Sequence, residues 1–249
     1  MIEWVQNRKG GFMTSFKRIA AVAAIFFGLA GEAHGYANLH LTAGVDYFTG
    51  FDQLNSELAS VSQAWRVNPT NAGADITPIG PLRMGFEVRA DLAFDLGPKV
   101  FWTHLLSAWT CMAFTTGTIE SAGFLTTYTT SVTAGLWTVG LDATTVIPIN
   151  QVFSFRWGVG IVGGTFSVDS SERSDFLGFK GDVSGTGHSE TLVVGYSFLV
   201  SVRVELDSGR TSALELTFRY LNLSDKEGFR LVSPVIQCQY VLPFELAKL

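Results

Sequence analysis

The 249-residue chain is poor in charge and in cysteine. Charged residues make up 16% of it, against about 25% in an ordinary soluble domain, whereas apolar residues make up 47%. Its two cysteines, Cys111 and Cys238, are too few for a disulfide scaffold. We expect both as free thiols, in strands that are not neighbours. The net charge of −5 gives no basic surface for nucleic acid, so no nucleic-acid partner is expected.

Long apolar runs are also missing from most of the chain. After residue 35, no stretch of about 18 residues is apolar and free of charge. A helical membrane protein is therefore not expected. The sequence also lacks a clear repeat, a low-complexity tract or a linker that would divide it. We expect a single domain over residues 36–249.

The first 35 residues have the pattern of a signal peptide. Lys17 and Arg18 precede the apolar run 19–30, and the run is followed by Ala33-His34-Gly35, which fits the small-x-small cleavage pattern. We expect residues 1–35 to direct export and to be cleaved near Gly35. Met13 is a second candidate for the initiator, because the residues before it do not resemble a signal. An uncleaved anchor is the alternative, although the run is short for a spanning helix.

The rest of the chain has alternation with a period of two, which is typical of β-strands. In residues 82–95, apolar side chains fall on one face, and charged ones such as Arg89 and Asp91 fall on the other. We expect eight strands of this kind, with ten as the alternative. The predicted strands are residues 39–47, 82–95, 100–114, 139–147, 153–161, 195–206, 214–220 and 229–242.

The connections between these strands alternate in length. Short turns at one end and longer loops at the other are typical of an up-and-down antiparallel transmembrane β-barrel in the bacterial outer membrane. An even number of strands places both chain ends on the periplasmic side. The tight turns are residues 96–99, 148–151 and 207–210, and the longer connections are residues 50–80, 115–123, 167–187 and 223–228.

Two architectures share this alternation, because a soluble barrel turns its apolar face inward and a membrane barrel turns it to lipid. The polar face favours the membrane barrel, since its charges nearly balance and its glycines suit a crowded interior. Aromatic residues toward the strand ends also resemble interfacial girdles. The predicted lumen charges form a structural network of five positive and six negative residues: Asp46, Arg83, Glu87, Arg89, Asp91, Asp142, Arg156, Arg203, Glu205, Glu215 and Arg219.

The positions of two turns predict which lumen charges face each other. The last tight turn predicts that Arg203 lies opposite Glu215 on the neighbouring strand. The turn before it, if centred on Ile149, places Asp142 opposite Arg156. Both pairs test the register of the predicted barrel.

Together these features resemble the small outer-membrane barrels of the OmpA, OmpX and OmpW type. The resemblance covers residues 36–243 and rests on the signal peptide, the alternation, and Gly140-Leu141-Asp142-Ala143 leading into Pro148-Ile149-Asn150. It implies outer-membrane lipid and the barrel-assembly machinery as partners. Such barrels usually end in an aromatic residue, whereas here residues 245–249 follow Phe244.

Few residues qualify as a catalytic or metal site. His188-Ser189-Glu190 has the residue types used by lipid A deacylases, which this chain resembles in architecture. Neighbours on a strand point to opposite faces, however, so no triad geometry is expected there. The acidic residues of the connection 167–187 match no calcium loop. We therefore expect no catalytic residue, no metal and no cofactor.

The longest connection, residues 50–80, contains one further pattern. Leu54, Leu58, Val61 and Trp65 have the spacing of one stripe of a short amphipathic helix. We expect this helix to cap the barrel mouth, with binding of a partner or a membrane surface as the alternative.

For function, the sequence predicts a non-enzymatic barrel with an envelope-structural or surface-interaction role. An extracellular ligand would bind through the connections 50–80 and 167–187. A narrow channel for small or apolar solutes is the main alternative, because lumen charges could line an ion path. An eight-stranded barrel is just wide enough to be filled by side chains, which favours an ion-pair plug. A lipid A-modifying enzyme is a third interpretation.

Overall fold

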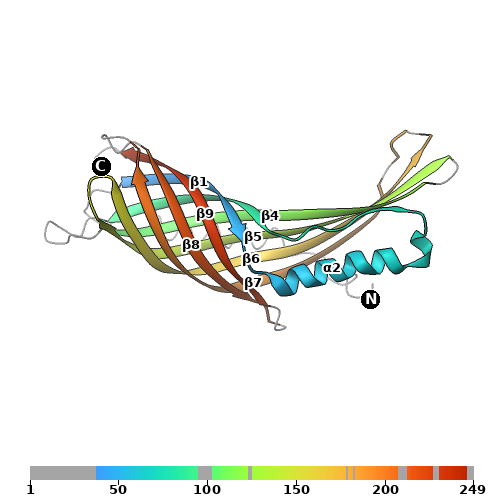
Figure 1. The fold of residues 1–249 in the computed structure, drawn as a ribbon, viewed down its shortest axis with the longest axis horizontal. Helices are drawn as coiled ribbons and strands as arrows, with labels where there is room; N and C mark the ends of the chain where they lie inside the picture. The colour runs from blue at the N-terminus through green and yellow to red at the C-terminus, as the bar shows by residue number, and fades with distance from the viewer. Residues whose placement is uncertain are drawn as a thin grey trace.

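The computed structural model describes residues 38–94, 103–122, 125–177, 179–181, 183–206, 212–226 and 230–245. Within these ranges the chain forms a closed antiparallel barrel of eight strands (Figure 1). Strand β5 pairs with both β6 and β4, which closes the barrel. The order around it is β4 (Thr103–Ala122), β3 (Met84–Phe94), β1 (Asn38–Phe48), β9 (Arg230–Glu245), β8 (Ala213–Ser224), β7 (Val183–Glu205), β6 (Phe153–Phe176) and β5 (Thr126–Pro148).

The fold class and the eight predicted strands are confirmed, because each predicted segment overlaps one of these strands. The predicted signal peptide, residues 1–35, lies outside the described residues. So do the tight turns 96–99 and 207–210.

The barrel wall is apolar outside and polar inside. On β3, Phe86 and Val88 are 50% and 44% exposed, whereas their neighbours Glu87 and Arg89 are fully buried. Strand β8 repeats the pattern, with buried and exposed residues in alternation. A soluble barrel would show the reverse, since water solvates charges and excludes large apolar surfaces. This wall is therefore a transmembrane one that faces lipid.

Four strands are longer than the sequence predicts. Residues 115–122, 167–176 and 183–187, expected as loops, are strand. The prediction fails there because outward positions change from apolar to small and polar, as at Thr129 and Ser131, so the hydrophobic alternation ends although the strand continues. The connections expected at residues 115–123 and 167–187 are therefore largely parts of extended hairpins.

These extended hairpins form a sheet that stands out from one end of the barrel (Figure 1). Strand β3 pairs with β4 only as far as Ala113, and β8 pairs with β7 only as far as Val194. We call the sheet beyond these points, made of the outer parts of β4, β5, β6 and β7, the projection. A short strand, β2 (Asp75–Thr77), pairs with the edge of β4 in the projection.

The connection between β1 and β3 contains the predicted helix, α2 (Asp52–Val67), which runs along the projection (Figure 1). A 3-10 turn (Pro69–Asn71) follows it. Leu54 and Leu58 are buried as expected, and Trp65 is partly buried against the same cluster. No helix in the described ranges has the length and hydropathy needed to cross a membrane.

The prediction is wrong at one position of the apolar stripe of the helix. Val61 is exposed, and Ser62 takes the buried place. A serine is tolerated there because its hydroxyl donates to the Leu58 carbonyl at 3.2 Å and accepts from the Ile79 amide at 2.9 Å. The hydrogen bond to Ile79 ties the helix to the returning chain, which a stripe of apolar residues could not predict.

The two cysteines lie as expected. Cys111 on β4 is buried, Cys238 on β9 is exposed on the outer wall, and both are free thiols. The two strands are not neighbours in the barrel.

Candidate functional site

The polar side chains inside the barrel form the candidate site. Alternation along each strand turns every second side chain inward, so the lumen receives charged residues from six of the eight strands. Ten of the eleven predicted lumen charges lie there, eight of them buried and Arg203 and Glu205 partly buried. The exception is Arg83.

Arg83 is exposed and precedes the first residue of β3. Its guanidinium donates to the hydroxyl of Tyr47, on the outer wall, at 3.4 Å. Leu82 beside it is wholly buried, so the alternation breaks before the strand begins and Arg83 turns outward. The expectation that Arg83 belongs to the lumen is therefore wrong. Without it, the predicted set holds four arginines and six carboxylates, a balance of 4 − 6 = −2.

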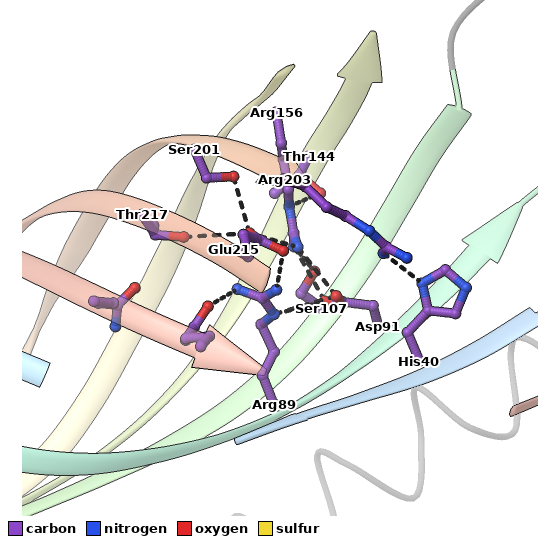
Figure 2. Close-up of polar contacts among 12 residues, drawn as sticks. His40, Arg89, Asp91, Ser107, Thr144, Arg156, Ser201, Arg203, Glu215 and Thr217 are labelled. Carbon is purple, nitrogen blue, oxygen red and sulfur yellow. Dashed lines mark hydrogen bonds and ion pairs between the residues drawn. The ribbon is translucent and has the colours of Figure 1, made fainter. Parts of the chain in front are cut away.

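Two arginines and two carboxylates in this lumen are fully paired. Arg89 Nη2 lies 2.7 Å from Glu215 Oε2, and Arg89 Nε lies 3.1 Å from Asp91. Arg156 donates to both oxygens of Asp91, at 3.0 and 3.1 Å. Figure 2 shows Arg89 and Arg156 converging on Asp91 and Glu215. We call these four residues the paired cluster.

Hydroxyl groups complete the paired cluster. Ser107 accepts from Arg156, whereas Ser201 and Thr217 donate to Glu215 Oε1, at 2.9 and 3.2 Å (Figure 2). Each buried charge thus meets an opposite charge and a neutral hydrogen-bond partner. A buried ion pair needs this arrangement to offset the loss of water.

The register of neighbouring strands tests the two predicted cross-strand pairs. Arg203 lies opposite Glu215, as predicted. Its guanidinium nevertheless pairs with Glu205, at 2.8 Å, and contacts His40, because Arg89 and Arg156 already engage Glu215.

The second predicted pair is wrong. Asp142 lies opposite Gly160 and not Arg156. The turn between β5 and β6 is centred beyond Ile149, because the side chain of Asn150 accepts hydrogen bonds from the amides of two later residues, 152 and 153, at 2.8 Å each. The side chain of one turn residue thus shifts the register of the hairpin.

The remaining buried charges form a second group that is not balanced. We call Asp46, Glu87, Asp142 and Arg219 the acidic cluster. Arg219 Nη2 lies 3.2 Å from Asp142 Oδ2 and 3.6 Å from Glu87 Oε1. The cluster thus holds one guanidinium and three carboxylates, and all four residues are at most 1% exposed.

Two glutamines of β9 supply most of the donors that the acidic cluster needs. Gln237 Nε2 lies 3.0 Å from Asp46 Oδ1 and 2.7 Å from Glu87 Oε2. Gln239 Nε2 donates to the other oxygen of Glu87 at 2.7 Å, and its own oxygen accepts from Arg89. Sequence reasoning missed both glutamines, although their two-residue spacing places them on the inward face of a predicted strand.

An apolar layer lies between the acidic cluster and the barrel mouth. The ring of Trp109 lies 3.9 Å from the guanidinium carbon of Arg219 and belongs to this layer. Residues before and within α2 and before β3 belong to the same buried layer. The main buried residues of this layer are Phe48, Phe51, Leu54, Leu58, Ile79, Leu82, Trp109, Leu136, Leu221, Leu223 and Leu231.

Glycines on the inward face show how closely this interior is packed. A Cβ atom on Gly140 would overlap the indole of Trp109, and one on Gly160 would overlap the carboxylate of Asp142. The sequence needs glycine there so that these larger side chains fit. The described lumen is thus crowded with side chains.

The His188-Ser189-Glu190 segment lies in the projection, on β7. His188 Nδ1 hydrogen-bonds with Asp169 on β6, and this bond raises the pKa of His188 above its ordinary value. Ser189 points to the other face of the sheet. The segment therefore has no triad geometry. In the described part of the chain, no group of three or more His, Cys, Asp or Glu residues could hold a metal ion.

Comparisons with known proteins yield matches among solved structures alone. No family model matches the chain. No curated protein matches it either. Among solved structures, Ail of Yersinia pestis, determined with the heparin analogue sucrose octasulfate, shares 10% identity over 84% of this chain and 99% of its own, with a TM-score of 0.40. Neisserial surface protein A shares 12% over 84% and 99%, with a TM-score of 0.31.

An outer-membrane channel from Pseudomonas putida F1 is similar over 84% of this chain and 96% of its own, at 8% identity and a TM-score of 0.27. Similarity at these values is limited to the overall course of the strands. The eight strands of this chain, and its wall with apolar side chains outside and polar ones inside, are those of a small outer-membrane β-barrel.

Proposed function

We propose that the protein is a non-enzymatic outer-membrane barrel that acts through its surface, with a filled lumen as scaffold and the projection as the binding element outside the cell. The observation that carries the proposal is the contrast between a crowded lumen and a sheet that leaves the barrel with an edge and a tip that none of the described residues covers. Export by residues 1–35, cleavage near Gly35 and insertion by the barrel-assembly machinery belong to the same proposal.

The edge of β7 supports a binding role. Residues 183–193 pair with β6 on one side, and among the described residues no strand pairs with them on the other. An uncovered strand edge presents unpaired backbone donors and acceptors, to which an extended segment of a partner can add. The opposite edge of the projection, on β4, is partly covered by β2. The β7 edge is thus the more open of the two.

The tip of the projection supports the same role. Leu125, Phe176, Leu177 and Phe179 lie at the ends of its two hairpins, and all are exposed. The Leu177 amide donates to the Leu125 carbonyl at 2.8 Å, which holds the hairpin ends together. Apolar side chains gathered on an exposed tip are typical of a contact surface.

The outward face of the projection is polar. It carries a shallow pocket of about 310 Å³, where the Ser131 and Ser171 hydroxyls hydrogen-bond at 2.7 Å. The Arg173–Asp175 ion pair, at 2.7 Å, lies at its rim. Hydroxyl and carboxylate groups at this place suit a ligand rich in hydroxyls, such as a saccharide.

The channel and the lipid A-modifying enzyme remain the competing functions. The apolar layer lies between the acidic cluster and the mouth, and the ion pairs fill the middle of the lumen, which supports a barrel without a water path. The separation of His188 and Ser189 onto opposite faces gives no support to an enzyme.

Two measurements, of adhesion and of ion conductance, test this proposal. Bacteria that display the wild-type chain should adhere to epithelial monolayers more than bacteria displaying the Leu177→Ser/Phe179→Ser variant. A matched control, Val159→Thr, changes an exposed residue of the barrel wall and should leave adhesion unchanged. The purified wild-type barrel should also be non-conducting in planar bilayers. Equal adhesion of all three strains, or steady ion currents, would refute the proposal.

A further inference from the structure

We propose that the acidic cluster is a proton-binding site inside the barrel, in which the Asp46–Glu87 pair holds one proton that stabilises the folded wall. The site lies in the lumen, away from the projection, and is independent of the proposed surface role.

The first support is the imbalance of charge. The paired cluster has two cations for two anions, and Arg203 pairs with Glu205 at the edge of the lumen. The whole excess of −2 therefore lies in the acidic cluster. Burying an ionised carboxylate without a counter-charge costs several kcal/mol, so the group takes up a proton instead.

The second support is the closeness of Asp46 and Glu87. Both carboxylates lie within hydrogen-bond distance of one atom, Gln237 Nε2. Two carboxylates that share a buried site repel each other when both are ionised, and such pairs commonly share a proton. Asp46 and Glu87 are such a pair, because both residues are buried and no guanidinium of the described residues lies within 3.5 Å of either carboxylate to offset the repulsion.

The third support is a hydrogen-bond acceptor without a donor. Gln237 Oε1 is buried and has no hydrogen-bond partner among the described residues, although its residue touches both carboxylates. A protonated carboxyl adds the O–H donor that such acceptors need, which removes the cost of an unmet group.

Among the residues that the structure describes, the surrounding strands offer no other cation for this pair. From β3, Arg89 is engaged by Asp91 and Glu215; from β8, Arg219 lies closer to Asp142 than to Glu87. From β4, the Cys111 thiol hydrogen-bonds with Asp46 and carries no charge that could offset it. Strands β6, β7 and β9 face the cluster with neutral groups: Gly160, Ser197, Gln237 and Gln239.

The pH dependence follows from linkage. The folded barrel holds a proton that the carboxylates of the unfolded chain release above about pH 4. The folded state then binds more protons than the unfolded state, so stability falls as pH rises. For one proton, the unfolding equilibrium constant increases by up to about tenfold per pH unit until the site is empty.

The test is urea unfolding of the full chain in detergent micelles from pH 5 to pH 10, followed by tryptophan fluorescence and gel migration. The wild-type urea midpoint should fall as pH rises. Glu87→Gln and Asp46→Asn should each reduce this slope, because each leaves one carboxylate where two shared a proton. Glu215→Gln, from the paired cluster, serves as control and should lower the midpoint at every pH while keeping the wild-type slope.

Two results would overturn the proposal. One is a wild-type midpoint that does not change over this range. The other is a slope that survives in both Glu87→Gln and Asp46→Asn. If one of these variants does not fold, the other carries the test, because either substitution removes half of the carboxylate pair.

Discussion

The paired cluster and the acidic cluster share one lumen, and they bury charge in different ways. In the first, each carboxylate meets a guanidinium at 2.7 to 3.1 Å and receives hydroxyl donors besides. In the second, one guanidinium contacts two of the three carboxylates, and the amides of Gln237 and Gln239 donate to Asp46 and Glu87. The difference teaches that a charged barrel interior is not held by ion pairs alone. Where buried carboxylates outnumber the guanidinium groups, neutral hydrogen-bond donors and bound protons must stabilise the remaining carboxylates.

The largest expected effect lies in the paired cluster. Arg156→Ala would leave Asp91 and Glu215 with one guanidinium between them, and removing one partner of a buried ion pair typically costs about 3–5 kcal/mol. Urea unfolding in micelles at pH 7 should show a loss of this size. Arg83→Ala, at the exposed arginine outside the lumen, is the control and should change stability by less than about 0.5 kcal/mol. Similar losses in the two variants would break the distinction between buried and exposed arginines.

A smaller effect is expected from crowding the acidic cluster. Gly160→Ala places a methyl group against the Asp142 carboxylate, and overpacking of this kind costs about 1–3 kcal/mol. Gly163→Ala, three residues along β6, meets nothing nearer than 4.0 Å and is a matched control. Unfolding midpoints of the two variants should differ clearly. Equal midpoints would show that Asp142 can move aside, which weakens the picture of a closely packed cluster.

The pair at the edge of the lumen should contribute less. Arg203 and Glu205 are 13% and 14% exposed and lie 2.8 Å apart. Arg203→Ala should cost about 1 kcal/mol, between the values for exposed and buried ion pairs. Unfolding in 0.1 M and 1 M salt tests the reason, because a partly solvated pair is screened. A cost as large as that of Arg156→Ala would place this pair within the buried network.

The smallest effect is expected in the projection. The hydrogen bond with Asp169 raises the pKa of His188, so the charged form stabilises the β6–β7 hairpin below the ordinary pKa of histidine and this stabilisation is lost as pH rises through the folded value. Asp169→Asn should return the pKa of His188 toward 6.5. An NMR titration of the imidazole measures this directly. An unchanged pKa in the variant would mean that the contact with Asp169 does not hold the charged form.

Alternation along the strands was enough to predict the barrel, the outward direction of its apolar face and most of its lumen charges. Glu87, Arg89 and Asp91 follow one another at a spacing of two, so their common face is fixed once the segment is a strand. Arg83 has the same spacing and still lies outside, because the strand begins one residue after it. The alternation of apolar and polar residues therefore does not show at which residue a strand begins or ends.

The geometry of the two clusters could not be predicted from the sequence. Which arginine meets which carboxylate depends on the stagger of strands that are distant in sequence, as for Arg89 and Glu215, 126 residues apart. It also depends on turns, where the side chain of Asn150 moved the β5–β6 register away from the one that a turn centred on Ile149 predicts. The projection escaped prediction because its outward residues are Ser, Thr and Asp, which sequence patterns associate with loops.

The contrast between the two clusters is tested most directly by infrared difference spectroscopy of the barrel in lipid bilayers between pH 6 and pH 10. A buried protonated carboxyl gives a carbonyl band that disappears when the proton leaves. We predict such a band for the wild type, its loss in the Asp46→Asn/Glu87→Gln double variant, and its retention in Asp91→Asn if that variant folds. A wild-type spectrum without the band would show both clusters to be fully ionised and would contradict this account of the lumen.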